Sequence, residues 1–177
     1  MPSNPRGGTS ALARKPLALL GFMGSGKTVV GALVAARAGA RFHDLDLMIE
    51  QEAGMTIADI FATRTEAAFR ALEKELLPKA LTPGSVVALG GGTLIDDANW
   101  RLVATQSMTV YLEVPFQAMW GRVHAQSGRP LIAGRSRDEI EALFERRRPR
   151  YEESSCRVDG DRPAEVVAAE VMRLWCG

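Results

Sequence analysis

The sequence predicts an α/β protein of three layers, in which helices cover both faces of a mostly parallel sheet. Three observations favour this class. Short continuous apolar runs are typical of strands buried on both faces, the amphipathic stretches between them are typical of helices, and a glycine-rich loop links the first run to a helix. Such alternation is typical of βαβ units. The 177 residues suit one domain of ordinary size.

Three apolar runs are the strand candidates: residues 17–20, 86–89 and 110–112. Each is short and lies beside a breaker. Pro16 precedes the first, a Thr-Pro-Gly turn precedes the second, and Pro115 follows the third. Because none of the runs alternates with polar residues, each is expected to be covered by helices on both sides.

Two stretches have the apolar period of a helix. In the first, apolar residues at i, i+3 and i+7 form a stripe and charged residues lie off it; the apolar ones are Phe69, Leu72 and Leu76, and the charged ones are Arg70, Glu73 and Lys74. In the second, residues 164–175, Pro163 precedes the first turn, and Val167, Val171 and Leu174 are expected on one buried side.

The composition excludes several classes of protein. Hydrophobic residues make up 46% and charged residues 24%, as in soluble globular proteins, and no apolar run approaches the roughly 18 residues of a membrane span. A net charge of +1 gives no general attraction to nucleic acid or anionic membranes. Two cysteines, Cys156 and Cys176, cannot form a disulfide framework, so we expect a reducing cytoplasm.

The two ends of the folded region are also suggested by composition. Residues 1–15 are rich in proline, glycine, serine and arginine and lack the apolar core of a signal peptide. We expect a disordered leader there, with a weak targeting tail as the alternative, and a single domain over residues 16–177. Residues 125–137 are polar, glycine-containing and arginine-rich, without a clear period. Long irregular segments inside compact domains are often lids, so we expect a mobile lid over about residues 122–137.

Residues 21–28 read Gly-Phe-Met-Gly-Ser-Gly-Lys-Thr and match G-x-x-x-x-G-K-[ST] at every defined position. The glycines let backbone N–H groups turn toward phosphate oxygens, and the following helix adds free N–H groups and a positive dipole end. Lys27 supplies positive charge at the β- and γ-phosphates, and the Thr28 hydroxyl is placed to bind Mg²⁺. The nucleotide-binding residues expected here are Gly24, Ser25, Gly26, Lys27, Thr28 and Val29.

Asp44 and Asp46 are the candidate acids of the site. Their period-2 spacing at a strand end predicts that both carboxylates lie on one side, at the sheet edge where parallel strands face the active crevice. One could help hold hydrated Mg²⁺ while the other accepts a proton from a hydroxyl. The alternative is that both cap the helix predicted over residues 47–50.

Three glycines and several arginines suggest how an acceptor is bound. Residues 90–92 are all glycine directly after a predicted strand, which lets a ligand approach the backbone closely. Arg70, with Glu73 one turn later, and Arg147 and Arg129 are candidates to bind a carboxylate or phosphate, because a planar guanidinium suits both anions.

Taken in order, these motifs resemble those of shikimate kinases, from about residue 16 onward. The series is residues 21–28, Phe42-x-Asp44-x-Asp46-x-x-Ile49-Glu50, Gly54-x-x-Ile57-x-x-Ile60-Phe61, Glu66-x-x-Phe69-Arg70-x-x-Glu73, Gly90-Gly91-Gly92, Arg129-Pro130-Leu131 and Arg147-x-Pro149-x-Tyr151. Only the first motif is specific alone, but the order and spacing of the whole series are highly specific. The resemblance implies a P-loop kinase fold with a five-stranded parallel sheet of order 2-3-1-4-5.

The resemblance also implies how the acceptor is held. In shikimate kinases the residue that matches Asp46 binds ring hydroxyls and lies nearest the attacking one, which makes Asp46 the candidate base. The residues that match Arg70 and Arg147 bind the shikimate carboxylate, and the backbone that matches Gly91 and Gly92 lines that pocket.

For the phosphoryl donor, the resemblance implies Mg²⁺ supported by Asp44, with Thr28 as a ligand. The residue that matches Arg129 moves with the lid and contacts the transferring phosphate. The residue that matches Arg122 stacks on adenine at the lid hinge, and Arg162 falls near the other side of the adenine.

Two positions depart from the usual family pattern. Thr65 stands where a glycine is common before Glu66, which is expected to alter how that helix begins. Arg150 stands where a leucine is common, which is expected to add positive charge near the acceptor pocket. Neither position is expected to touch substrate.

The resemblance implies ATP-dependent phosphorylation of the shikimate 3-hydroxyl, in the pathway to chorismate and the aromatic amino acids, by a monomer without nucleic-acid or membrane partners. The nearest alternative is another small-metabolite kinase of this fold, such as a gluconate kinase, because two arginines also suit gluconate. An alternative of another class is a regulatory nucleotide-binding module without transferase activity. A nucleic-acid-binding patch at residues 146–150 is the weakest alternative, since no aromatic residues are interleaved there.

Overall fold

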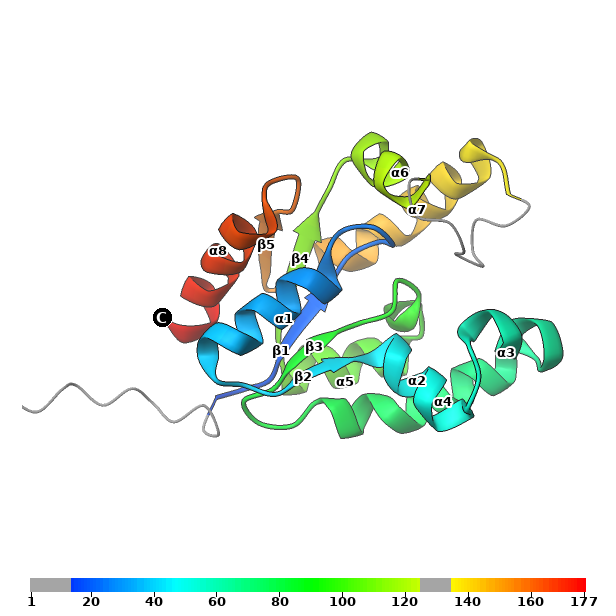
Figure 1. The fold of residues 1–177 in the computed structure, drawn as a ribbon, viewed down its shortest axis with the longest axis horizontal. Helices are drawn as coiled ribbons and strands as arrows, with labels where there is room; N and C mark the ends of the chain where they lie inside the picture. The colour runs from blue at the N-terminus through cyan, green and yellow to red at the C-terminus, as the bar shows by residue number, and fades with distance from the viewer. Residues whose placement is uncertain (1–13, 125–134) are drawn as a thin grey trace, which may run out of the picture.

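The computed structural model describes residues 14–124 and 135–177 and contains a five-stranded parallel sheet of order β2-β3-β1-β4-β5 (Figure 1). The predicted fold class and strand order are therefore confirmed. The strands are β1 (Leu17–Leu20), β2 (Phe42–Asp44), β3 (Val86–Ala88), β4 (Met108–Glu113) and β5 (Cys156–Asp159). The helices are α1 (Lys27–Ala38), α2 (Leu45–Ala53), α3 (Ile57–Thr63), α4 (Glu66–Ala80), the 3-10 helix η2 (Thr93–Ile95), α5 (Asp97–Gln106), α6 (Phe116–His124), α7 (Arg137–Glu152) and α8 (Ala164–Cys176).

The central strand β1 explains why its sequence is apolar at every position. Its four residues are all buried, and it pairs with β3 on one side and β4 on the other, so that Leu17 is level with both Val86 and Met108. Successive side chains point to opposite faces of a strand. Leu17 and Leu19 accordingly join one apolar cluster, while Ala18 and Leu20 join the other.

The two clusters are the interfaces between the three layers. Helices α1 and α8 cover one face of the sheet, where Val30 and Val34 pack with Val167 and Val171 (Figure 1). The remaining helices gather on the other face, around a larger cluster that includes Ile49 of α2 and residues of α4 to α7. The loops that follow β1, β2 and β3 all leave from the carboxyl edge of the sheet, because the strands are parallel.

The buried stripes of two helices differ from those predicted. In α8, Leu174 is 39% exposed, and Trp175 is buried in its place. The buried face of this helix is centred closer to Ala168 than predicted, so Leu174 lies at the edge of that face. The buried residues are Val167, Ala168, Val171 and Trp175. In α4, Glu73 is only 1% exposed and lies within the buried face, although a charged residue is expected outside it. Glu73 can be buried because its carboxylate accepts hydrogen bonds from Arg70 and Thr93.

The first described residues are hydrogen-bonded to the last helix, α8. The Arg14 guanidinium donates a hydrogen bond to Cys176 Sγ (3.0 Å), and Trp175 Nε1 donates to the Lys15 carbonyl (2.8 Å). Arg14 and Lys15 of the predicted leader thus contact α8, and the rest of that predicted leader, residues 1–13, lies outside the described residues. In the part of the chain that the structure describes, no helix is long and apolar enough to cross a membrane.

Candidate active site

The phosphate loop joins β1 to α1 and depends on glycine for its shape. Gly21, Gly24 and Gly26 have φ angles of 147°, 77° and 90°. Side chains with a Cβ rarely adopt such angles, so these three positions require glycine. The backbone N–H of Ser25 donates to the Phe22 carbonyl (3.2 Å), which closes the turn.

Lys27 and the first turn of α1 make this loop electropositive. Lys27 Nζ donates to the carbonyl oxygens of Gly21 (2.8 Å) and Phe22 (2.9 Å), so its ammonium group lies against the loop. The first hydrogen bond at the start of α1 runs from Val30 N–H to the Gly26 carbonyl (2.9 Å). The N–H groups of residues 27–29 precede it and have no acceptor within the helix. With no acidic residue in that turn, the positive end of the helix dipole is left for an anion.

Thr28 and Asp44 bring the phosphate loop and the end of β2 together. Thr28 Oγ1 donates to Asp44 Oδ2 (2.6 Å). The other oxygen, Asp44 Oδ1, accepts from the backbone N–H groups of Asp46 (3.1 Å) and Leu47 (3.3 Å) and thereby caps α2. Asp44 thus fulfils the capping alternative and still faces Thr28.

The predicted strand spacing of the two aspartates is wrong. Helix α2 begins at Leu45, so Asp46 belongs to the first helical turn and only Asp44 ends the strand. The two carboxylates are neighbours because of the cap, and not because of a strand repeat. The predicted role of Asp44 at the magnesium site and its predicted role as a helix cap are therefore compatible, because one turn of the chain provides both.

Asp46 is held in a largely buried position where its carboxylate retains a proton unusually well. Burial, and then the negative charge of Asp44, raise the pKa of Asp46 to about 6, and the Lys27 ammonium opposes this rise. A Cβ built on Gly90 would lie only 2.7 Å from Asp46 Oδ1, so the carboxylate packs directly on the glycine backbone. A group with a pKa near 6 is suited to receive a proton at neutral pH.

The arginines predicted to bind an acid converge on one glycine. A Cβ built on Gly92 would lie 3.0 Å from Arg70 Nη2 and 3.1 Å from Arg147 Nη2, so both guanidinium groups flank the same point. Arg147 Nη1 is buried without a hydrogen-bond partner among the described residues. Buried donors are normally paired, so this atom points to an acceptor supplied by a ligand. Burial lowers the pKa of Arg147, and the charge of Arg70 acts in the same direction.

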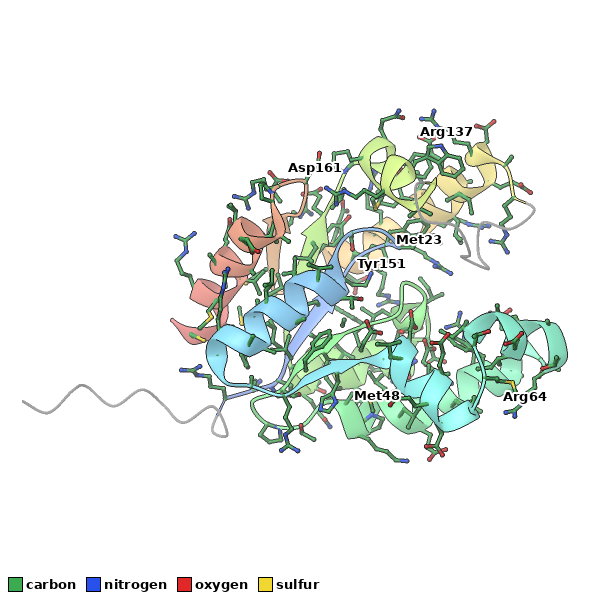
Figure 2. All side chains as sticks on the ribbon, viewed as in Figure 1. Met23, Met48, Arg64, Arg137, Tyr151 and Asp161 are labelled. Carbon is green, nitrogen blue, oxygen red and sulfur yellow. The ribbon has the colours of Figure 1, made fainter. Side chains whose placement is uncertain are left out.

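The arginine pair adjoins the phosphate loop. A Cβ built on Gly91 would lie 3.7 Å from Arg147 Nη1, 3.8 Å from the Gly21 carbonyl oxygen and 3.5 Å from the Met23 backbone nitrogen. The same Gly21 carbonyl accepts from Lys27. Figure 2 shows Met23 near Tyr151, whose hydroxyl donates to the Gly91 carbonyl. A bound acid and a bound phosphate chain would therefore be neighbours across the residues 90–92.

The residues predicted to surround the adenine are less well gathered. Arg122 on α6 approaches the Gly24 carbonyl (3.5 Å) and forms an ion pair with Asp161 (2.7 Å), which Figure 2 labels in the loop after β5. Arg162 turns toward α8 and pairs with Glu170 (2.5 Å), so its guanidinium is engaged away from the phosphate loop. Arg129 and most of the predicted lid lie outside the described residues, at 125–134.

The two departures from the family pattern have structural consequences. Thr65 caps α4, since its hydroxyl accepts from the backbone N–H of Ala68 (3.2 Å). Arg150 does not add free charge to the acceptor pocket, contrary to expectation. It pairs with Asp97 and with Glu153 (3.1 Å), and its guanidinium lies 5.5 Å from the Trp100 ring centroid.

Sequence reasoning missed two residues of this site. Thr93 Oγ1 donates to the buried carboxylate of Glu73 (2.7 Å), and the Tyr151 hydroxyl donates to Gly91, so both contact the functional groups without being assigned a role. A signal existed for each. Thr93 directly follows the three glycines, and Tyr151 lies one helical turn after Arg147.

The oxygen donors beside the phosphate loop fit a magnesium ion. The Thr28 hydroxyl and Asp44 Oδ2 are adjacent, and both are the hard ligands that Mg²⁺ prefers. The described residues contain no group of three or more histidine, cysteine, aspartate and glutamate side chains that could hold a metal alone. The adjacent Thr28 and Asp44 oxygens suit an ion that is bound also by phosphates and water.

Comparisons with known proteins agree with this geometry. The family model "Shikimate kinase" matches residues 23–175. A curated shikimate kinase from Salinibacter ruber is 43% identical over 167 residues, which cover 88% of this chain and 82% of the relative. The structure of a shikimate kinase from Acinetobacter baumannii in complex with shikimate is 29% identical, with a TM-score of 0.87 over 92% of this chain and 93% of that one.

A gluconokinase structure from Sinorhizobium meliloti is also similar, at 18% identity and a TM-score of 0.57 over 92% of this chain and 94% of that chain. At that identity the likeness extends to the fold alone. The family match, in contrast, spans residues 23–28 of the phosphate loop, both aspartates, the three glycines and Arg147. The chain belongs to the shikimate kinase family.

Proposed function

We propose that this chain transfers the γ-phosphoryl group of ATP to the 3-hydroxyl of shikimate, which gives shikimate 3-phosphate and ADP on the route to chorismate and the aromatic amino acids. Membership of the shikimate kinase family supports the reaction. The observation that carries the proposal is the convergence of Arg70 and Arg147 on Gly92, beside both the phosphate loop and Asp46.

The donor half of the reaction is assigned to the phosphate loop. The backbone N–H groups of residues 24–29 bind the phosphate oxygens, and Lys27 leaves its carbonyl partners to contact the β- and γ-phosphates. Thr28 and Asp44 hold the magnesium ion, the latter through water. The bound ion neutralises charge on the phosphates. Because Thr28 already contacts Asp44, little rearrangement of these side chains is needed.

The acceptor half is assigned to the arginine pair and Asp46. Arg70 and Arg147 bind the carboxylate of shikimate, and the unpartnered Arg147 Nη1 gains an acceptor. The backbone of Gly91 and Gly92 lines the same pocket and leaves room for the acid. Asp46 orients the 3-hydroxyl and takes its proton as the new P–O bond forms, a role that suits a carboxyl of pKa about 6.

The remaining residues complete the nucleotide site. Arg129 approaches the transferring phosphate from the lid, Arg122 stacks on the adenine, and Arg162 lies at the other side of the ring. For Arg162 this requires release from Glu170, its partner in the ion pair with α8. Closure of the lid over about residues 122–137 excludes water, which would otherwise compete as acceptor. The enzyme works as a cytoplasmic monomer without nucleic-acid or membrane partners.

A coupled assay of ADP release with a panel of hydroxy acids tests the proposal. We expect release of ADP to depend on shikimate and on Mg²⁺, with little release when gluconate replaces shikimate. Preference for gluconate would assign the chain to the rival metabolite kinases. Release of ADP at the same rate without any acceptor would favour a regulatory nucleotide-binding module.

A further inference from the structure

The two arginines of the acid pocket belong to different helices, and their guanidinium groups meet at the glycine loop. Arg147 is on α7 and Arg70 is on α4. Both carry positive charge, and the charge of Arg70 lowers the pKa of Arg147, so the two groups repel each other. Because like charges repel each other at short distance, contacts elsewhere must hold the two guanidinium groups in place.

On the α7 side, the framework is a buried phenol. Tyr151 lies one helical turn after Arg147, is 2% exposed, and donates its hydroxyl to the Gly91 carbonyl. Its ring packs against that of Tyr111, with centroids 5.5 Å apart. Burial raises the pKa of Tyr151 above its ordinary value, so the phenol keeps its proton at neutral pH and remains a donor.

On the α4 side, the framework is a buried carboxylate. Glu73 lies one turn after Arg70 and pairs with it through Oε2 (2.8 Å), while Glu73 Oε1 accepts from Thr93 Oγ1 (2.7 Å). Thr93 is fully buried and its carbonyl accepts from Asn99 Nδ2 (3.0 Å), which ties the end of the glycine loop to α5. A buried carboxylate is costly unless its oxygens are paired, so Glu73 depends on both partners.

We propose that Tyr151 and Thr93 are positioning residues that fix the glycine loop between α7 and α4, and thereby set the spacing of Arg147 and Arg70 for a carboxylate. Each holds one end of residues 91–93, and both guanidinium groups meet at Gly92 between these ends. The role rests on the proposed function, since it concerns how the same pocket binds shikimate.

The test compares Tyr151→Phe with Tyr111→Phe. Both variants remove a buried phenol oxygen and keep the ring, but the Tyr111 hydroxyl has no hydrogen-bond partner among the described residues, whereas the Tyr151 hydroxyl has one. We expect Tyr151→Phe to raise the KM for shikimate about 3- to 10-fold, the scale of one hydrogen bond, with the KM for ATP changed less than about twofold. Tyr111→Phe should leave both KM values within about twofold of wild type.

A second pair of variants examines the other end of the loop. Thr93→Val removes the hydroxyl at nearly constant volume and should also raise the KM for shikimate selectively, while Thr93→Ser keeps the donor and should restore it. This pair keeps the inference testable if Tyr151→Phe proves too unstable to purify. Equal effects of Tyr151→Phe and Tyr111→Phe, a parallel rise in both KM values, or failure of serine to rescue would each overturn the positioning role.

Failure of the inference can be told apart from failure of the proposed function. The proposed function is decided on the wild-type chain, by whether ADP release depends on shikimate. The positioning role is decided only by the variants, with the shikimate dissociation constant from titration calorimetry measured beside KM. A lowered melting temperature without a change in the dissociation constant would reduce Tyr151 to a stabilising residue and overturn the assignment.

Discussion

The carboxylate of Asp46 packs against the backbone of Gly90, so closely that a Cβ at Gly90 would lie 2.7 Å from Asp46 Oδ1. That distance is shorter than any relaxed contact, and a second neighbour, Thr93 Oγ1, would be 3.0 Å away. The first of the three glycines is thus required to make space for the candidate base, rather than for a substrate.

Replacement of Gly90 by alanine should therefore act on the base. We expect Gly90→Ala to lower kcat about 10-fold or more, because displacement of a catalytic group by about 1 Å is enough for such a loss. Steady-state kinetics measure the effect. Gly121→Ala is the matched control, since a Cβ at that position on α6 meets nothing within 4 Å and should leave kcat unchanged.

Replacement of Asp46 by asparagine should remove the proton acceptor and keep the shape of the site. The expected loss of kcat is about 100-fold or more, which is the scale of general base catalysis. Initial rates at saturating ATP and shikimate provide the measurement. Turnover close to that of wild type would exclude Asp46 as the base.

The raised pKa of Asp46 predicts two opposite pH effects. As pH rises through about 6, Asp46 loses its proton, so kcat should increase over that range and level off above it. Stability should change in the other direction. Between about pH 4 and 6 the folded chain holds a proton that the unfolded chain, with an aspartate pKa near 3.9, has released, so the Asp46 contribution falls as pH rises.

This loss of stability is on the order of 1–3 kcal/mol, and it should be missing in Asp46→Asn. Urea unfolding of wild type and Asp46→Asn at pH 4.5 and 7.5 measures this loss as the difference in unfolding free energy between the two proteins. Taking the difference cancels the opposite contributions of other carboxyls. One of these is Asp96, whose pKa is lowered by its hydrogen bond to Lys74. A difference that is the same at both pH values would contradict the raised pKa.

Loss of either arginine of the pair should weaken shikimate far more than ATP. For Arg147→Ala we expect the shikimate dissociation constant to rise at least about 10-fold, because a charge-assisted bidentate contact is lost, with the ATP constant nearly unchanged. Calorimetric titration with each ligand gives both values. Arg148→Ala is a suitable control, since Arg148 lies on the exposed side of α7 and pairs with Glu145. If both ligands weaken equally, the arginine pair is not the acid pocket.

Arg150 should affect stability and leave substrate binding unchanged. It links α7 to α5 through Asp97 and the Trp100 ring, and its side chain is 23% exposed. Arg150→Leu should lower the free energy of unfolding by about 1 kcal/mol, the scale of one partly buried ion pair with a cation–π contact. Denaturant unfolding tests this, and an altered KM for shikimate would show that the charge does reach the pocket.

Much of the fold could be predicted because its signals are local. A strand buried on both faces is apolar at every position, as in β1, and a phosphate loop has fixed glycines, as at Gly21 and Gly26. What could not be predicted depends on partners distant in sequence. Glu73 looks like a surface residue of a helix until Thr93, twenty residues later, is placed beside it.

The same limit applies to the aspartates and to Arg150. Spacing alone cannot distinguish two residues of a strand from a cap followed by a helical turn, and at Asp44 the turn is what the chain forms. The positive charge of Arg150 is evident from the sequence, but the direction in which its side chain points is decided by the ion pair with Asp97 on α5. Motif order identified the chemistry, while tertiary contacts decided which residues support it.

The contacts of Arg14 and Lys15 with α8 place the first and last described residues side by side, on the side of α8 and away from the phosphate loop (Figure 1). A short peptide could join Gly177 to Arg14 at a small entropic cost, and the polypeptide could then be opened at a surface turn such as Gly39, where space is free around the glycine. We expect such a rearranged chain to reach the same fold, although its strands would follow one another in a different order along the sequence.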